Sequence, residues 1–188
     1  MGIPDGKKVV LYAPTWRDSA DGGRSYRLAP PIDFGKWEQV LGESHVLLFR
    51  AHHMTTKVLN VQFNDFVRDC SDYPDINDLM IAADLLITDY SAVAFDYSIL
   101  QRPILIFAYD YDAYAAERGM YFDMAAEFPS EIYRDEDALL QALRTVDAAD
   151  ASARTATFSR KFMEYGGSAT QACVDALFET AKEGVRSN

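Results

Sequence analysis

The chain has 188 residues, of which 49% are hydrophobic, and it carries a formal net charge of −11. This size and composition are typical of a single globular domain with a full core, and the acidic balance argues against a surface that tracks nucleic-acid phosphates, so no nucleic-acid partner is expected. The two cysteines lack CxxC or Cys/His spacing, which argues against a disulfide framework or a zinc site, and no metal or other cofactor is expected.

Membrane insertion is not predicted. No apolar stretch reaches the roughly 18 residues needed to cross a bilayer, because Asp84, Asp89 and Asp96 interrupt the longest candidate. The first residues, MGIPDGKK, have neither the apolar core of a signal peptide nor the Ser/Thr of a myristoylation signal. We therefore expect a cytoplasmic protein, unless a missing part of the polypeptide supplies an anchor.

Short apolar runs alternate with helical patterns along the chain, which predicts the α/β class: a Rossmann-like, mostly parallel sheet with helices on both faces. In chain order we expect a strand at Val9–Tyr12, a mobile loop at Asp18–Pro31, strands at Val46–Phe49 and, more weakly, Phe63–Val67, a helix at Asn77–Ala83, a strand at Leu85–Ile87, a helix at Ala92–Leu100, a strand at Ile104–Ala108, and helices at Asp135–Leu143, Ser152–Tyr165 and Ser168–Lys182.

Polar residues follow three of these strands. Ligands of such sheets bind at the carboxyl ends of the strands. The segments there are Ala13–Asp18, Arg50–His53 and Thr88–Ser91. Together they would place hydroxyls, arginines and an imidazole on one edge of the sheet, which predicts an anion site.

The helix start after Leu85–Ile87 favours a phosphorylated ligand. Ser91 can cap this helix while the N–H groups of Ala92 and Val93 point outward at its positive end. Asp96 lies one turn beyond Ala92, where a carboxylate could accept hydrogen bonds from a sugar or an amine but would repel phosphate.

Four further side chains could complete this site. Thr15 or Thr88 could add a hydroxyl, and Arg17 or Arg50 a charged fork. Each candidate also has a structural interpretation. Both arginines could be surface charges paired with acids, His52 a structural imidazole at a strand end, Ser91 only a cap, Asp89 only a turn former and Asp96 a solvated helix residue.

The strand-end motifs together resemble a known family. "VLYAPTWRD", "LLFRAHH", "DYPDINDLMIAADLLITDYSAVAFDYSILQRPILIFAYDYDAY" and "RGMYFD" look like the carboxyl-terminal half of CDP-glycerol:poly(glycerophosphate) glycerophosphotransferases, the teichoic-acid polymerases and primases. The resemblance covers about Lys8 to Asp123 and, more loosely, the helices to about Glu179. It implies the carboxyl-terminal half of a GT-B-type fold, in which two Rossmann-like domains face each other across a cleft.

The resemblance also implies an activity. Such enzymes transfer glycerol phosphate from CDP-glycerol to a polyol-phosphate polymer or a lipid-linked acceptor and release CMP, at the inner face of the cell membrane. The family carries a second essential histidine in an "HGTP"-like motif, which is missing here. Residues 1–188 are therefore expected to form one donor-binding domain, closed by helices at about 152–182, without its amino-terminal catalytic partner domain. Alone, it is expected to bind a cytidine nucleotide weakly and not turn over.

Site residues follow from the family's motifs. Pro14-Thr15 and Arg50-Ala51-His52 match donor-contacting strand ends, with His52 on a histidine important for activity. Ser91-Ala92 match a pyrophosphate-binding helix start that usually has a second serine, and Asp96 matches the aspartate of an "FD" pair. A non-enzymatic cytidine-nucleotide-binding module, or a transferase half that uses CDP-ribitol or a sugar nucleotide, remain alternatives. The full candidate set is His52 as the catalytic group and, for substrate binding, Pro14, Thr15, Arg17, Arg50, Ala51, Thr88, Asp89, Ser91, Ala92 and Asp96.

Overall fold

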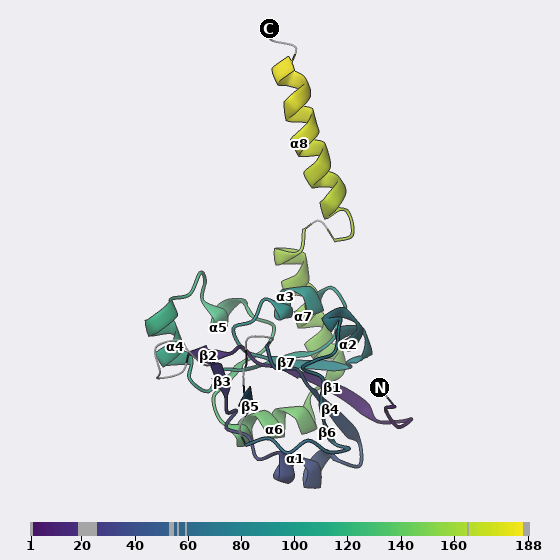
Figure 1. Ribbon diagram of the computed structural model, residues 1–188, viewed down its shortest axis with the longest axis vertical. Coiled ribbons are helices and arrows are strands. Elements are labelled where there is room, and N and C mark those ends of the chain that lie inside the picture. The colour runs from purple at the N-terminus through teal and green to yellow at the C-terminus, as the bar shows by residue number, and fades with distance from the viewer. Residues whose placement is uncertain are drawn as a thin grey trace.

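A parallel sheet forms the centre of the domain in the computed structural model, which describes residues 2–18, 26–52, 55, 57–58, 60–164 and 166–185 (Figure 1). Over these ranges the sheet has six strands in the order β6-β4-β1-β7-β8-β9, and every neighbouring pair is parallel. Its strands are β1 (Lys8–Ala13), β4 (His45–Phe49), β6 (Val67–Asp69), β7 (Leu85–Thr88), β8 (Ile104–Phe107) and β9 (Ile132–Tyr133). The predicted α/β class is confirmed.

Eight helices occur in the described ranges. They are α1 (Phe34–Leu41), α2 (Ile76–Ala82), α3 (Val93–Ser98), α4 (Tyr111–Arg118), α5 (Met124–Glu127), α6 (Glu136–Thr145), α7 (Ala148–Phe162) and α8 (Ala169–Val185). Figure 1 shows α1 and α6 on one side of the sheet, α2, α3 and α7 on the other, and α8 extending away from it. No helix in the part of the chain that the structure describes is long and apolar enough to cross a membrane.

Both faces of the sheet are buried, which explains why its strands are continuous apolar runs. Side chains of β1 alternate between two core clusters: Val10 and Tyr12 pack with α1 and α6, whereas Val9 and Leu11 pack with α2 and α3. With the strands fixed in this way, their carboxyl ends lie along one edge of the sheet and their amino ends along the other.

Some predicted boundaries are wrong. The expected strand Phe63–Val67 begins only at Val67, because the Asn64 side chain accepts hydrogen bonds from the Phe66 and Val67 N–H groups and forms a turn there. The expected helix Ala92–Leu100 is shortened to Val93–Ser98 and ends in a turn, with Gln101 at a positive φ of 53°.

The prediction of a mobile loop at Asp18–Pro31 is partly wrong. Within it, β3 (Tyr26–Leu28) pairs with β2 (Arg17–Asp18) and β5 (Lys57–Val58) in a small second sheet. The rest of the expected loop, 19–25, lies outside the described residues.

The closing helices begin and end differently from the prediction. The expected helix Ser152–Tyr165 begins four residues earlier, at Ala148, because Asp147 caps it by accepting hydrogen bonds from the N–H groups of Ala149 and Asp150. It ends at Phe162, and Tyr165 lies outside the described residues.

Three of the helices, α1, α4 and α5, were not predicted from the sequence. Helix α1 contains Gly35 near its start and follows two prolines, so its local helix preference is weak. Asp33 caps it by accepting a hydrogen bond from the Lys36 N–H, and Phe34, Trp37 and Leu41 are buried on one side. Burial of this apolar stripe, more than propensity, therefore determines the helix.

Candidate functional site

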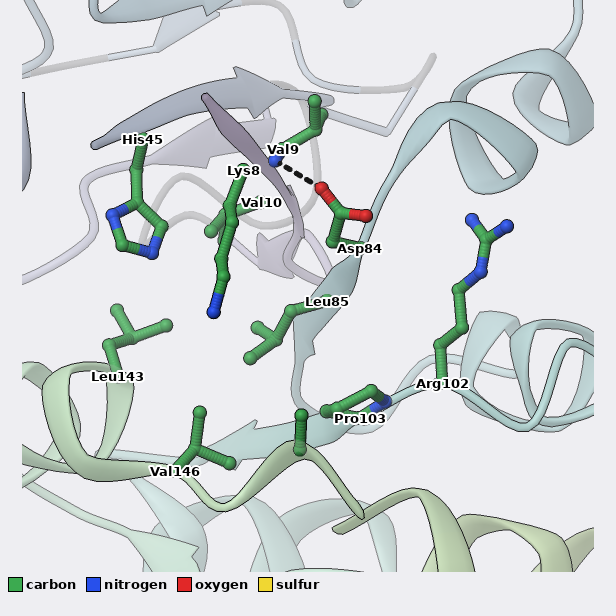
Figure 2. Close-up of a pocket in the computed structure, with 11 residues that line it drawn as sticks. Lys8, Val9, Val10, His45, Asp84, Leu85, Arg102, Pro103, Leu143 and Val146 are labelled. Carbon is green, nitrogen blue, oxygen red and sulfur yellow. Dashed lines mark hydrogen bonds between the residues drawn. The ribbon is translucent and has the colours of Figure 1, made fainter. Parts of the chain in front are cut away.

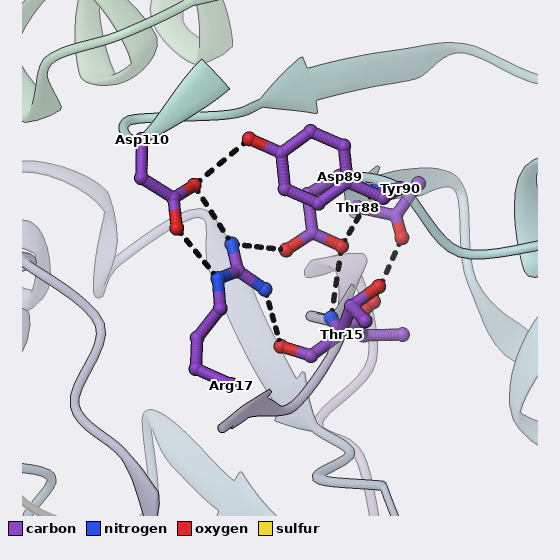
Figure 3. A network of polar contacts seen from close by, with 7 residues as sticks. Thr15, Arg17, Thr88, Asp89, Tyr90 and Asp110 are labelled. Carbon is purple, nitrogen blue, oxygen red and sulfur yellow. Dashed lines mark hydrogen bonds and ion pairs between the residues drawn. The ribbon is translucent and has the colours of Figure 1, made fainter. Parts of the chain in front are cut away.

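A buried ion-pair network joins the carboxyl ends of three strands (Figure 3). Arg17, after β1, donates from Nη2 to Asp89 Oδ2 at 2.9 Å and from Nε to Asp110 Oδ2 at 2.7 Å. Its Nη1 donates to the Thr15 carbonyl at 2.6 Å. Since Asp89 follows β7 and Asp110 follows β8, a single guanidinium ties the three loops together.

The two carboxylates of this network differ in pKa. Asp89 is 1% exposed, and burial raises its pKa, although the Arg17 charge opposes this effect. Burial acts in the same direction on Asp110, but hydrogen bonds from Arg17 and from the Tyr90 hydroxyl outweigh it and lower the Asp110 pKa. Loss of Arg17 would therefore leave Asp89 buried without a counter-charge.

Aromatic rings enclose the guanidinium. The Arg17 Cζ atom lies 5.0 Å from the centre of the Tyr90 ring and 5.2 Å from that of Tyr109. The Tyr90 ring in turn stacks on Tyr114 of α4, with centroids 3.6 Å apart. These contacts partly shield the ion pairs from water and fix the position of Tyr90.

Arg50 has a comparable internal role. Its Nη1 group donates to the carbonyl oxygens of Cys70 and Ser71, both at 2.7 Å, and also to that of Tyr73. It thereby holds the loop after β6 against the end of β4. Among the described residues, both Arg17 and Arg50 thus bond to other groups of the same domain.

A cleft of about 400 Å³ lies beside this network at the carboxyl edge of the sheet. It brings together residues that follow β1 and β4 with the start of α3, as the strand-end rule predicts. The residues that line it are Ala13, Pro14, Thr15, Trp16, Arg50, Ala51, His52, Ile76, Tyr90, Ser91, Ala92 and Val93. Of the predicted site residues, it therefore contains Pro14, Thr15, Arg50, Ala51, His52, Ser91 and Ala92.

The Thr15 hydroxyl is an unsatisfied polar group in this cleft. Its Oγ1 atom is buried and makes no hydrogen bond of normal geometry among the described residues, although it lies close enough to Asp89 to oppose the rise in the pKa of that carboxyl; the Thr15 N–H donates to Asp89 Oδ1 at 2.8 Å. A buried hydroxyl without a partner is costly and calls for an explanation. Because Oγ1 has almost no accessible surface, a ligand oxygen in the cleft could become that partner only after the Thr15 side chain moves.

His52 lies in a row of side chains at the mouth of the cleft. Its ring centre is 6.3 Å from that of Trp16, and the Arg118 guanidinium, from the end of α4, lies 5.2 Å from the Trp16 ring. His52 itself is half-buried. Its neighbour His53 lies outside the described residues.

The N-cap position of α3 is Ala92, which makes no side-chain cap hydrogen bond, but the preceding Ser91 still contacts the first turn. The Ser91 Oγ atom accepts a hydrogen bond from the Val93 N–H at 3.3 Å, and the Ala92 N–H has no partner in the described ranges. Because α3 has only six residues, its dipole is small. Any anion contact here would depend mainly on individual N–H groups and the serine hydroxyl.

Four predicted residues, Arg17, Thr88, Asp89 and Asp96, do not line the cleft, and Arg17 lies in the ion-pair network beside it. Thr88 is fully buried, and its hydroxyl donates to the Ala13 carbonyl at 2.7 Å. Asp89 belongs to the Arg17 network, and Asp96 is exposed on α3. Thr88 and Asp89 thus lie behind the residues that line the cleft and hold them in place.

Sequence reasoning missed Trp16, Tyr90 and Asp110. Trp16 and Tyr90 lie within the segments "APTWR" and "TDYS", but the site residues predicted in these segments were other side chains with hydroxyl or charged groups. Asp110 follows β8, and the strand-end rule applied to that strand would have found it.

The chain is similar to several known proteins. The family model described as CDP-glycerol:poly(glycerophosphate) glycerophosphotransferase matches residues 1–179. A teichoic acid glycerol-phosphate transferase of Staphylococcus aureus is 38% identical over 184 residues, which are 95% of this chain and 47% of that protein. A teichoic acid poly(ribitol-phosphate) polymerase of Bacillus spizizenii is 33% identical over 73% of this chain and 22% of its own length.

A solved structure is also similar. The wall teichoic acid polymerase TagF superimposes with a TM-score of 0.77 at 34% identity, over 97% of this chain and 46% of that one. A TagF variant soaked with CDPG gives the same TM-score. The chain thus spans about half the length, or less, of the relatives it matches.

Replacement of Arg17 should destabilise the domain severely. Arg17→Met keeps an apolar side chain of similar length but leaves Asp89 buried without its partner, which typically costs about 3–5 kcal/mol. Urea denaturation would measure the loss. Arg134→Met is the matched control, since Arg134 pairs with Asp112 at the exposed surface, and it should have little effect. Equal stability of the two variants would contradict a structural role for the Arg17 network.

Asp110 should make the stability of the domain depend on pH. Its pKa is lowered by folding, so it contributes stability that is complete above its unfolded pKa of about 3.9 and is lost as pH falls through the folded value. The difference in unfolding free energy between the parent and Asp110→Asn should therefore shrink as pH falls below about 4. A difference that stays constant or grows would contradict this.

Proposed function

Because the chain belongs to the CDP-glycerol:poly(glycerophosphate) glycerophosphotransferase family, we propose that its strand-end cleft binds the cytidine diphosphate part of CDP-glycerol. The observation that carries this proposal is the unsatisfied Thr15 hydroxyl in a cleft that also contains His52 and the start of α3. Hydroxyl, imidazole and backbone N–H groups are all donors to phosphate oxygens. None of these three groups brings a negative charge that would repel a diphosphate.

The reaction that this site would serve is phosphoryl transfer. The hydroxyl oxygen of the acceptor forms a bond to the phosphorus that carries glycerol, and its proton passes to a base that the facing domain would supply. The bond from that phosphorus to the bridging oxygen breaks, and CMP leaves with the electron pair. Such a transfer needs positioning and charge neutralisation more than covalent catalysis. His52 would donate a hydrogen bond or a proton to a phosphate oxygen as negative charge develops on CMP. Thr15 and Ser91 would hold the diphosphate in place.

The arginines have a supporting role in this proposal. Arg17 keeps the Thr15 segment against the ends of β7 and β8, and Arg50 keeps the loop after β6 against the end of β4. Arg50 adds positive potential at the cleft, which it lines, whereas the charge of Arg17 is balanced by Asp89 and Asp110. Thr88 and Asp89 act through the same packing and do not need to touch the donor.

The whole enzyme would need more than this cleft. Residues 1–188 are proposed to form the donor-binding half of a GT-B-type enzyme, since the chain covers 46% of TagF. A facing domain would supply further catalytic groups and bind the polyol-phosphate polymer or lipid-linked acceptor. The enzyme would then act as a peripheral protein at the inner face of the membrane.

The polyol of the donor is a second point of the proposal. The similarity to a poly(ribitol-phosphate) polymerase favours CDP-ribitol as the alternative donor. Both donors carry the same cytidine diphosphate, which is the part that Thr15, His52 and Ser91 would contact. The cleft residues therefore recognise what the two donors share.

Nucleotide binding by the chain can be tested by calorimetric titration. We expect CDP-glycerol and CDP-ribitol to bind more tightly than UDP-sugars. Thr15→Val should weaken CDP-glycerol binding about tenfold or more, because a hydrogen bond to a charged group contributes about 1.5–3 kcal/mol. The free energy of unfolding should change little, because the Thr15 hydroxyl makes no hydrogen bond of normal geometry that the substitution would remove. Thr157→Val, on the exposed face of α7, is the matched control. Unchanged binding by Thr15→Val would refute the contact.

His52 can be tested by transfer activity in a protein that contains both halves. His52→Ala should lower kcat by about 10²-fold or more, as expected for loss of a proton donor or a transition-state hydrogen bond, with a smaller effect on KM. Gln141→Ala, exposed on α6, serves as the control. Full activity of His52→Ala would remove the proposed role, and loss of donor binding alone would reassign His52 to binding.

A further inference from the structure

A second cavity lies at the opposite edge of the sheet from the donor cleft. It has a volume of about 260 Å³ and lies where β1, β4 and β7 begin (Figure 2). The junction between α6 and α7 closes it from the other side. The residues that line it are Lys8, Val9, Val10, His45, Asp84, Leu85, Arg102, Pro103, Leu143, Val146 and Ala148.

The walls of this cavity are mostly aliphatic. Leu85 and Pro103 come from the strand starts, and Leu143 and Val146 from the end of α6 (Figure 2). Since a water molecule occupies about 30 Å³ in the liquid, the volume corresponds to roughly nine water-sized groups. Such a space fits a short apolar ligand body but not a nucleotide.

Two nitrogen-bearing side chains converge on the cavity. The Lys8 side chain extends into it beside the His45 ring, toward Leu143 and Val146 (Figure 2). The Lys8 ammonium has no hydrogen-bond or ion-pair partner in the ranges that the structure describes. His45 Nδ1 lies 2.7 Å from the Ser44 hydroxyl, so its other ring nitrogen remains for a ligand. A hydrophobic cavity with a few placed polar groups is typical of a small-molecule site.

The other charged groups of the lining are already engaged. Asp84 Oδ2 accepts a hydrogen bond from the Val9 N–H at 2.8 Å, and the carboxylate turns toward that amide in Figure 2. Arg102 Nη1 donates to the carbonyl oxygens of Ile81 and Ala83, both at 2.6 Å. With Lys8 and Arg102 positive and Asp84 negative, the lining has one net positive charge, and Lys8 is the cation that makes no hydrogen bond in the described ranges.

The electrostatics of His45 fit an anion at this position. Burial lowers the His45 pKa, and the nearby Lys8 charge lowers it further. An anion bound between the His45 ring and the Lys8 ammonium would reduce the unfavourable effect of Lys8 on a protonated His45 and would give the ammonium an ion-pair partner.

From this arrangement we propose that the cavity binds a small amphiphilic anion, with a carboxylate or phosphate monoester head between Lys8 and His45 and a short aliphatic tail against the apolar wall. The site lies at the other end of the strands that carry the donor cleft, and the proposal does not depend on donor binding or catalysis. Its ligand class differs from a nucleotide in both size and polarity.

Calorimetric titration of the chain with sodium hexanoate and with hexyl phosphate tests this proposal. We expect saturable one-to-one binding of at least one of the two anions, and their relative affinity assigns the head group. Acetate, which lacks the tail, and 1-hexanol, which lacks the charge, should each bind at least about tenfold more weakly. Absence of saturable binding for both anions, or equal binding of hexanol, would overturn the proposal.

Substitutions locate the site. Lys8→Met should weaken binding about tenfold or more, and it should fold normally because Lys8 is exposed. Val146→Phe should abolish binding because it fills the cavity. Lys161→Met, on α7 away from this edge, should bind like the parent. If Lys8→Met binds like the parent, or if Lys161→Met is weakened equally, the anion does not bind in this cavity and the proposal fails.

Discussion

The ion pairs of Arg17 with Asp89 and Asp110 are the constraint on which the carboxyl edge of this domain depends. They join the loops after β1, β7 and β8 in a largely buried setting, where a charge without its partner is costly. The Tyr90 ring packs against the same guanidinium and also lines the cleft. The shape of the cleft therefore follows from charges that lie behind it, and the residues that face the ligand are held by residues that do not.

This arrangement separates two roles that similar residue types play. Thr15 lines the cleft and has a buried hydroxyl beside it without a normal hydrogen bond, whereas the Thr88 hydroxyl donates to the Ala13 carbonyl within the sheet. His52 lies at the mouth of the cleft, whereas His45 lies at the start of the neighbouring strand, at the other edge. One parallel sheet thus carries two cavities of different chemistry, because the ends of its strands are not equivalent.

Much of the fold could be predicted from the apolar runs of the sequence. The strands β1, β4, β7 and β8 lie where the sequence predicts them, since strands buried on both faces must be continuously hydrophobic. Helix α1 and the start of β6 could not be predicted in this way. Helix α1 depends on burial of Trp37 in the assembled core, and the start of β6 depends on a turn formed by Asn64. Both depend on contacts that local propensity does not describe.

For the site, the sequence by itself determined which segments meet at the carboxyl edge: "APTWR", "RAH" and "TDYS" each follow a strand, and parallel strands bring their ends together. It also indicated the family, because those motifs occur together in order. Only the tertiary structure decided which side chains face the cleft and which are buried behind it. Arg17 and Asp110 are 93 positions apart, and their pairing depends on the order of the strands in the sheet. The cavity beside Lys8 likewise forms only when the end of α6 packs against the strand starts, so no local pattern could reveal it.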